Sequence, residues 1–580
     1  MNRPPRDALR PLLRLIHELT RRHVVRVVIA YLVAAWLIVQ VASTLLPTMG
    51  FDNSAIRVVL VVVAVGLPVS IVVSWYFDLT LQGFRLTGPD EDTGIPTPLT
   101  GTVALAGSPP DPLSLAVVAF SDHSEAHDQE FLAKGISEEL TNLLGRVASL
   151  KIVPRSSAFA FEGKGLDIRQ VGRHLNVAHV LDGSVRKAGR RLRIAVELID
   201  VVGGYSKWMN VYDRDAEAVF DIQNEIARNI LEELGPHLLE NAAPSVLSHP
   251  GTKSVEAYDA YLKGRFYWNS RYAVGLEKSL ECFGRAAQID PNYALPLSGL
   301  ADAYNLLAFY NFVPPRDGYG KADELARRAH ALAPSRAETN ASLAFVQHFF
   351  DWNFAAAETS YRRALAAQGN YGPARFWFAF LDASLGRQED ARLQIEAAKN
   401  AEPFSAIIHG GASYLDYFQG RHESGLRAAT EVLDADPNFG PAHMFLGFHR
   451  LAIGDYTGAV ECWRTAVARQ DRMLLAHLML ATSLALSGDN AEARRILLHV
   501  DNAAKGYVSS HFRAIASLSL GERDTALGWL EKALEERNSF LVLAGMEPLL
   551  ASLRGEPRFQ RVLQQVGVPI QAVNPIQRAA

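Results

Sequence analysis

The chain has 580 residues, with 58 lysines and arginines against 62 aspartates and glutamates and a formal net charge of −4. This length allows three or four domains, and the near-neutral charge balance excludes a generally basic nucleic-acid binder. The chain has two cysteines, which excludes a disulfide-stabilised scaffold and a zinc site made of cysteines alone. Apolar residues make up 49% of the chain, and much of the excess lies near the N-terminus.

Two apolar runs, residues 27–46 and 58–77, contain no charged side chain. A helix rises about 1.5 Å per residue, so each run is long enough to cross a hydrocarbon core of about 30 Å. Residues 47–57 join the runs as a short polar link, and the pattern therefore predicts a two-helix transmembrane hairpin. A cleaved signal peptide is the alternative for the first run, but its length and the second run that follows disfavour this interpretation.

Arginines are concentrated before the first apolar run. Residues 1–26 contain seven of them, whereas the link between the runs contains only Arg57. Because positive charge stays on the cytoplasmic side of a membrane, we expect residues 1–26 to form a basic cytoplasmic segment. Two crossings then return the chain to the cytoplasm. Glycine, proline, aspartate and threonine throughout residues 87–112 predict a flexible linker.

Residues 113–235 alternate short apolar runs with helical periodicity. The run 113–120 is typical of a buried strand, and the apolar residues of 131–147 recur at helical spacing. Three β-rich runs separated by glycine-containing turns follow, and an amphipathic helix at about 216–234 ends the segment. The order β-α-β-α-β-β-β-α predicts one small α+β domain.

This segment resembles a known bacterial family. The stretches 131–140 (FLAKGISEEL), 155–161 (RSSAFAF) and 180–186 (VLDGSVR) are similar to the TolB amino-terminal-like (FlgO-like) domain. That domain is often preceded by a membrane segment and followed by tetratricopeptide repeats, which implies a multi-pass protein of the bacterial inner membrane. The resemblance implies that the soluble domains lie in the periplasm, whereas the charge count implies the cytoplasm, which we prefer.

A basic cluster brackets one predicted hairpin turn of the same segment. We interpret it as a solvated set that protects the sheet edge, with a phosphate or lipid-headgroup contact as the alternative. Its members are Arg186, Lys187, Arg190, Arg191 and Arg193.

A 34-residue period runs through the C-terminal half of the chain. Small residues stand five positions after and seven positions before each glycine of the period, and such columns are typical of tetratricopeptide repeats. In each repeat two helices approach closely and the glycine turns the chain between them. We predict about eight repeats over residues 258–538 and a C-terminal capping segment at 539–567. The glycines of the period are Gly386, Gly420, Gly454, Gly488 and Gly521.

Stacked repeats form a solenoid with a concave surface, which in this family generally binds peptides or proteins. Aromatic residues on the predicted first helices of two successive repeats are the candidate protein-binding residues. The alternative is that they are core residues, which is the commoner role for aromatics at helical spacing. The candidates are Phe376, Phe380, Tyr414 and Tyr417.

The predicted fold class is mainly α: a two-helix transmembrane hairpin, a small TolB-like α+β domain and an α-solenoid of tetratricopeptide helix pairs. The sequence contains no G-x-S-x-G, H-E-x-x-H, P-loop or dinucleotide-binding motif. We therefore expect a non-catalytic membrane-anchored scaffold with a protein or peptide in the groove and the lipid bilayer as partners, and without cofactor, metal or nucleic acid.

Two other functions remain open. Relatives of the TolB-like module sometimes carry an adenylate cyclase or a winged-helix DNA-binding domain at the N-terminus. Since 26 residues precede the first apolar run, we expect neither here, but a sensory or regulatory subunit that controls a separately encoded cyclase or transcription regulator is the alternative. An enzyme within residues 113–235 is the third hypothesis.

Overall fold

The chain divides into two units, Met1–Ile95 and Pro96–Ala580, and each is described by itself. The computed structural model describes the following residues: 40, 77–80, 83–86, 109–145, 147, 149–164, 166–235, 251–269, 272–435, 439–469, 473–502, 506–573 and 576.

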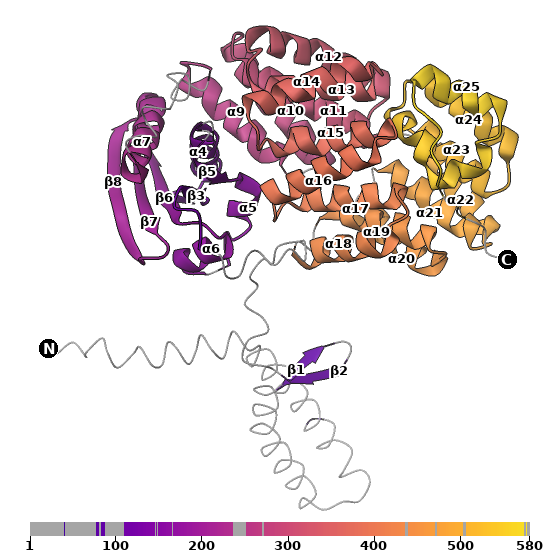
Figure 1. Ribbon diagram of the computed structural model, residues 1–580, viewed down its shortest axis with the longest axis horizontal. Coiled ribbons are helices and arrows are strands. Elements are labelled where there is room, and N and C mark those ends of the chain that lie inside the picture. The colour runs from indigo at the N-terminus through magenta and orange to yellow at the C-terminus, as the bar shows by residue number, and fades with distance from the viewer. Residues whose placement is uncertain are drawn as a thin grey trace, which may run out of the picture. The chain divides into compact units, whose positions relative to one another are not determined.

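The described part of the first unit is a short β-hairpin (Figure 1). Strand β1 (Phe77–Thr80) pairs in antiparallel fashion with β2 (Gly83–Leu86), so that Phe77 faces Leu86 in the register. Phe77 was expected to end the second membrane span, and it begins a strand instead.

The predicted transmembrane hairpin needs correction. Among the described residues, no helix combines the length and the apolar character that crossing a membrane requires. The helix α21 (Leu474–Leu486) is apolar, but its 13 residues span only about 20 Å, which is shorter than a hydrocarbon core of about 30 Å. The fold class is therefore a mainly helical solenoid with a small sheet region, and the multi-pass membrane location is withdrawn. The runs 27–46 and 58–77 themselves lie outside the described residues, apart from Gln40 and Phe77.

The sheet region belongs to the second unit. Its strands follow the order β5-β3-β6-β7-β8, with β4 paired to β6. Strand β3 is parallel to β5 and β6, whereas β6, β7 and β8 form an antiparallel meander. The strands are β3 (Ser114–Val117), β4 (Ser121–Asp122), β5 (Lys151–Val153), β6 (His179–Ala188), β7 (Arg191–Asp200) and β8 (Tyr205–Asp215).

Four helices and a 3-10 turn accompany this sheet. Side chains of α4 and α7 share one buried cluster with the strands, including Ile136, Leu181 and Ile226. The short helix α6 begins with a capping box. The Asp167 side chain accepts a hydrogen bond from the Arg169 backbone N–H, and the Gln170 side chain accepts one from the Asp167 backbone N–H. The elements are α4 (Glu130–Leu144), α5 (Arg155–Phe159), α6 (Ile168–His174), η2 (Ala216–Ala218) and α7 (Val219–Leu234).

Helix pairs occupy the described residues from 255 to 535, and each pair stacks on the next (Figure 1). The first helices are α9 (Val255–Trp268), α11 (Ala294–Phe309), α13 (Ala337–Phe349), α15 (Gly372–Ser384), α17 (Ala406–Phe418), α19 (Gly440–Ala452), α21 and α23 (Ser510–Ser519). The second helices are α10 (Ala273–Ile289), α12 (Pro315–Leu332), α14 (Phe354–Ala367), α16 (Gln388–Ala401), α18 (His422–Ala435), α20 (Tyr456–Arg469), α22 (Asn490–Asn502) and α24 (Arg523–Glu535).

The glycine period explains how these pairs turn. Gly386, between α15 and α16, has a φ of 79°, a left-handed conformation that glycine adopts without strain. Gly420, Gly454, Gly488 and Gly521 repeat this geometry at the turns of the following pairs. The small residues that accompany the period are buried between the helices, as for Ala391 and Ala459.

The α+β region and the first repeat share one buried core. At Gly135 of α4, an added Cβ would lie 2.5 Å from the Leu262 side chain of α9, so the two helices are in close contact. The Gln223 side chain of α7 donates a hydrogen bond of 2.7 Å to the buried Tyr258 hydroxyl. The sheet region therefore caps one end of the solenoid.

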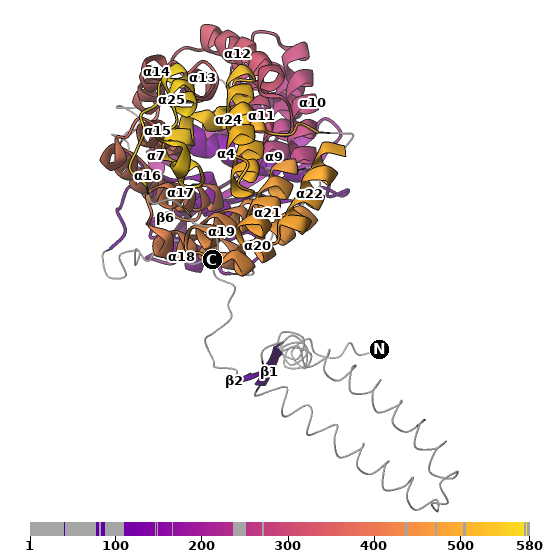
Figure 2. The same ribbon diagram turned by 90° about the vertical axis from the view of Figure 1, so that its right-hand side faces the viewer.

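After the last helix pair, the chain returns to the interior of the superhelix. Figure 2 shows the helix pairs winding around, with α24 and α25 nearest the viewer at the C-terminal end, while η3 contacts α11, α13 and α15. The returning elements are the 3-10 helices η3 (Ser539–Met546) and η4 (Pro548–Leu553) and the helix α25 (Pro557–Val566).

Candidate partner-binding groove

The 3-10 helix η3 lies against the first helices of the early repeats. It contacts α11, α13 and α15, which together line the concave side of the superhelix. The Phe540 ring stacks on Phe309 of α11 at a centroid distance of 5.1 Å and meets Phe512 of α23 edge-on at 4.7 Å. Every residue of η3 is buried. The concave interior is thus occupied by the chain's own C-terminal segment.

Polar bonds fix both ends of this segment. Arg316 at the start of α12 donates two hydrogen bonds to the Glu535 carbonyl, at 2.9 and 2.7 Å. The Tyr417 hydroxyl of α17 donates to the Glu547 carboxylate at 2.5 Å, between η3 and η4. The Gln571 side chain donates to the Ala383 carbonyl at 2.8 Å, and its backbone N–H donates to the Gly545 carbonyl of η3 at 3.0 Å.

The apolar contacts stabilise this segment in the groove. Large apolar side chains contribute about 1.5–3 kcal/mol each when fully buried, so exposing six of them costs on the order of 10 kcal/mol. A micromolar complex supplies only about 8 kcal/mol. The six side chains are Phe540, Leu541, Val542, Leu543, Met546 and Leu550.

The structure brings the four predicted binding residues together and buries each of them. Phe376 and Phe380 on α15 are 5.3 Å apart, and Tyr414 and Tyr417 on α17 stack at 6.0 Å. Phe376, Phe380 and Tyr414 line an apolar cavity of about 50 Å³. Their role in partner binding stays a prediction, because these contacts also suit a core.

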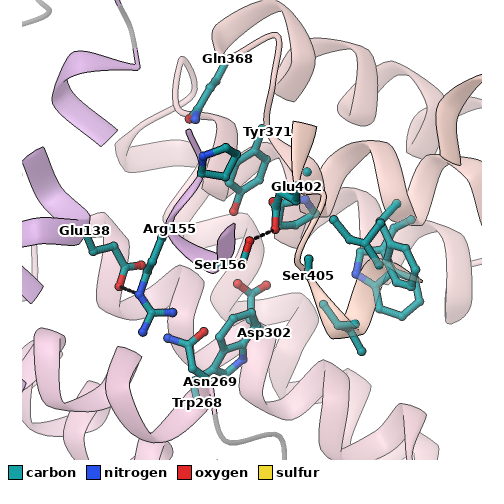
Figure 3. Close-up of a pocket in the computed structure, with 18 of the residues that line it drawn as sticks. Glu138, Arg155, Ser156, Trp268, Asn269, Asp302, Gln368, Tyr371, Glu402 and Ser405 are labelled. Carbon is teal, nitrogen blue, oxygen red and sulfur yellow. Dashed lines mark hydrogen bonds and ion pairs between the residues drawn. The ribbon is translucent and has the colours of Figure 1, made fainter. Parts of the chain in front are cut away.

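A larger cavity of about 210 Å³ remains open beside them (Figure 3). Helices α4 and α5 of the sheet region form one wall, and the first helices α9, α11, α13, α15 and α17 form the other. It is therefore the part of the concave groove that η3 does not fill. Phe376 and Trp377 line both cavities, so that the polar opening leads to the apolar one.

Three charged side chains form an ion triad in this cavity's wall, a buried Glu138 and the half-buried Arg155 and Arg265. The Glu138 carboxylate on α4 accepts from Arg265 of α9 at 3.1 and 2.6 Å and pairs with the Arg155 Nε at 3.2 Å. Burial opposes the charge on Glu138, but the two guanidinium groups outweigh burial and hold the pKa of this carboxyl below its usual value. The triad therefore joins the sheet region to the first repeat through one shared carboxylate.

Two further carboxylates lie in the same space. The Ser156 hydroxyl of α5 donates to Glu402 at 2.6 Å, and Figure 3 shows Ser156 between Arg155 and Glu402. Ser342 donates to Asp302 of α11, also at 2.6 Å. The cavity thus presents both signs of charge, together with apolar walls.

The charged residues of the cavity were not singled out from the sequence. Glu138 and Arg155 lie in stretches 131–140 and 155–161, which carry the resemblance to the TolB-like domain. Their partner Arg265 is 127 residues from Glu138, and nothing in a single sequence indicates such a pairing.

The basic cluster at the β6–β7 turn is largely paired, which favours a structural role. Lys187 reaches across to Asp259 of α9 and so adds a second ionic link between the sheet region and the first repeat. The ion pairs are Arg186–Glu125 at 3.8 Å, Lys187–Asp259 at 3.2 Å, Arg190–Glu217 at 2.6 Å and Arg191–Asp213 at 2.7 Å.

No family model matches the chain. A curated protein of Rhizobium meliloti (strain 1021), named "Putative adenylate cyclase 3", is 31% identical over 242 residues. The match covers 41% of this chain and 40% of that protein, so the chain spans about two-fifths of the length of the relative it matches.

Solved structures with similar folds are distant. The human IFIT1 dimer with m7Gppp-AAAA has a TM-score of 0.39 at 15% identity, covering 60% of this chain and 88% of that one. A tetratricopeptide repeat protein from Parabacteroides merdae ATCC 43184 has a TM-score of 0.32 at 15% identity, covering 46% and 98%. YrrB, described as a TPR protein with an unusual peptide-binding site, scores 0.21 at 19% identity, covering 32% and 89%.

The assignment of the solenoid rests on this chain's own helix pairs and their 34-residue period, since these TM-scores are low. The repeats form a tetratricopeptide-like solenoid. The sheet region that caps it is a separate α+β element, and its proposed relationship to the TolB-like family is taken up below.

We predict that Glu138→Gln destabilises the chain by about 3 kcal/mol, because it leaves the half-buried Arg155 and Arg265 side by side without their shared counter-charge. Chemical unfolding measures this loss. Glu256→Gln, which breaks an exposed pair with Arg285, is the matched control and costs about 0–1 kcal/mol. Equal effects of the two substitutions would contradict the structural role of the triad.

The anchor at Glu547 predicts a pH effect. Burial raises the pKa of Glu547 to about 7, against the hydrogen bonds from Tyr417 and Leu549 and the charge of Arg554. The folded state therefore binds more protons than the unfolded state between pH 4.5 and 7, so its stability falls as pH rises through this window. Relative to Glu547→Gln, the native chain should lose roughly 2 kcal/mol between pH 5 and 8.

The comparison with Glu547→Gln is needed because buried histidines act in the opposite direction. Burial lowers the pKa of His348, His409 and His511 to about 3 and that of His449 to about 4, so they favour unfolding as pH falls below about 6.5. Both chains carry these histidines, and the difference between their urea-unfolding free energies isolates Glu547. Parallel pH profiles would show that Glu547 is not buried as described.

Proposed function

We propose that this protein is a non-catalytic interaction module that binds a short segment of a partner in the open part of its solenoid groove. The observation that carries the proposal is the cavity of about 210 Å³ between the sheet region and the first helices α9 to α17. The rest of the concave interior is filled by η3 and η4, so this opening is where a partner gains access to the groove.

The lining of the cavity supports recognition of a segment that has both polar and apolar groups. Arg155, Asp302 and Glu402 supply charges, while Phe376 and Trp377 continue into the apolar cavity. In this proposal Phe376 contacts the partner. Phe380, Tyr414 and Tyr417 pack in the core and hold the Phe376 side chain in place.

The sheet region takes part in binding under this proposal, because α4 and α5 form one wall of the cavity. We further propose that the region is a TolB amino-terminal-like domain, on the strength of the stretches 131–140, 155–161 and 180–186. The consequence is that recognition depends on two elements of different fold and not on the repeats alone.

A regulatory subunit is the second candidate function. It is favoured by the similarity to the Rhizobium meliloti protein, whose printed name includes adenylate cyclase. In this alternative, occupancy of the same cavity changes the activity of a separately encoded enzyme. The two candidates differ in the partner and share the site.

The test is to select peptides from a random library on the full-length chain and to measure their dissociation constants by calorimetry. Asn142 on α4 lines the cavity and is half-buried, so Asn142→Trp should block it. We expect the selected peptides to bind this variant at least about tenfold more weakly, which corresponds to about 1.4 kcal/mol.

The matched control places the same large side chain elsewhere. Glu232 is exposed on α7 and lies outside the cavity lining, so Glu232→Trp should leave the affinities unchanged. Selected peptides that bind Asn142→Trp as tightly as the native chain would place the binding surface elsewhere and refute the proposal.

A further inference from the structure

We infer that the groove cavity recognises an amino-acid-type group, consisting of a carboxylate, a neighbouring N–H donor and an apolar side chain. The inference rests on the proposed function, because it uses the same cavity, and it adds the chemistry of the ligand. Two sources carry this chemistry: a free apolar amino acid, and the C-terminal residue of a partner chain.

Arg155 is the residue that would bind the carboxylate of the ligand. Its Nε faces Glu138 at 3.2 Å, and its guanidinium lies over the Phe159 ring at 4.7 Å. Within the described part of the chain, no hydrogen-bond acceptor meets either Nη atom, and Glu138 is the ion-pair partner of the guanidinium, with Glu162 and Glu402 adding to its attraction. Figure 3 shows the guanidinium group extending into the space beside Asn269 and Asp302. Two Nη donors on one planar group fit the two oxygens of a carboxylate.

The two arginines of this wall share one carboxylate. Arg155 and Arg265 both pair with Glu138, while Asp302 and Glu402 add two further carboxylates to the cavity lining. Burial and the neighbouring Arg265 lower the pKa of Arg155, against the attraction of Glu138. A carboxylate that accepts hydrogen bonds from Arg155 would replace the hydration that burial removes from this guanidinium.

The N–H donor is matched by Asn305 on α11. This side chain is 1% exposed, and its amide nitrogen donates weakly to the Ser342 carbonyl at 3.5 Å. Its carbonyl oxygen is buried without a donor among the described residues, and Asn305 is one of the residues that line the cavity. A buried acceptor without a donor costs about 1–3 kcal/mol, so a ligand that supplies an N–H gains from this position.

The apolar side chain of the ligand would pack against the apolar wall of the cavity. Phe345, Phe376, Trp377 and Ile408 line the cavity, and Phe376 and Trp377 continue into the second cavity of about 50 Å³. A branched aliphatic or aromatic side chain directed there would exclude water from apolar surface. The three matches therefore define one ligand chemistry.

Two simpler alternatives fit less well. A purely structural junction would pair its buried polar groups, whereas the Nη atoms of Arg155 and the Asn305 carbonyl are left without hydrogen-bond partners in the part that the structure describes. A phosphate group would place two negative charges next to Asp302 and Glu402, which line the same cavity. A singly charged carboxylate beside an N–H donor avoids this repulsion.

The experiment is calorimetric titration of the full-length chain with three probes: free leucine, N-acetyl-Gly-Gly-Leu with a free carboxylate, and the same peptide with a C-terminal amide. We expect at least one of the first two probes to bind, and the amidated peptide to bind at least about tenfold more weakly than its free form. Binding of leucine would identify the free amino acid as the source, and binding of the free peptide alone would identify a chain terminus.

The matched variant is Arg155→Lys, which keeps a positive charge beside Glu138 and removes the two parallel Nη donors. It should lower affinity for the bound probe at least about tenfold, with a much smaller loss of melting temperature than Glu138→Gln causes. Arg362→Lys, on the exposed side of α14, is the control and should change neither quantity.

The inference is overturned if none of the three probes binds, if the amidated peptide binds as well as its free form, or if Arg155→Lys binds normally. These failures differ from failure of the proposed function. Library peptides that bind the native chain but not Asn142→Trp, and that tolerate amidation, would sustain the proposed function and refute the ligand chemistry.

Discussion

The packing of η3 into the interior of the superhelix is the interaction on which the other features depend. A tetratricopeptide-like solenoid exposes the inner side of its first helices unless something covers it. Here Phe540 and its neighbours in η3 complete a buried cluster that extends from Phe309 on α11 to Val566 on α25. The C-terminal segment therefore contributes to the same core as helices more than 200 residues earlier in the chain.

This packing determines where the groove is open. Since η3 packs against α11, α13 and α15 and η4 against α23, the remaining space lies where the sheet region meets the first helices. The Glu138 triad and the shared core around Leu262 fix the sheet region at that position. The cavity is thus bounded by two domains, and its charges come from both of them.

The repeat architecture could be predicted because the residues that produce it lie close together in the sequence. A glycine every 34 residues sets a left-handed turn, and the small residues that flank it allow the two helices of one pair to touch, so the pattern and its cause lie within one repeat. The expected membrane hairpin was inferred from two uncharged runs of twenty apolar residues joined by a short link, and it is corrected because no helix among the described residues is long and apolar enough to cross a membrane. Phe77, expected at the end of a span, pairs with Leu86 in a strand.

The site could be predicted only in part, for a physical reason. Helical spacing places Phe376, Phe380, Tyr414 and Tyr417 on the inner face of the first helices, but it carries no information about what covers that face. The covering contact, Tyr417 to Glu547, joins residues 130 positions apart, and the pairing of Glu138 with Arg265 spans 127. Such contacts result from the closure of the whole superhelix.

The most direct test of this account is amide hydrogen exchange of the full-length chain, followed by mass spectrometry across residues 539–553. Burial of this segment in the groove predicts that its peptides exchange as slowly as those of the lining helices α15 and α17, through global unfolding. Exchange at the rate of an unprotected peptide would show that the concave groove is open along its length, and would contradict the central claim.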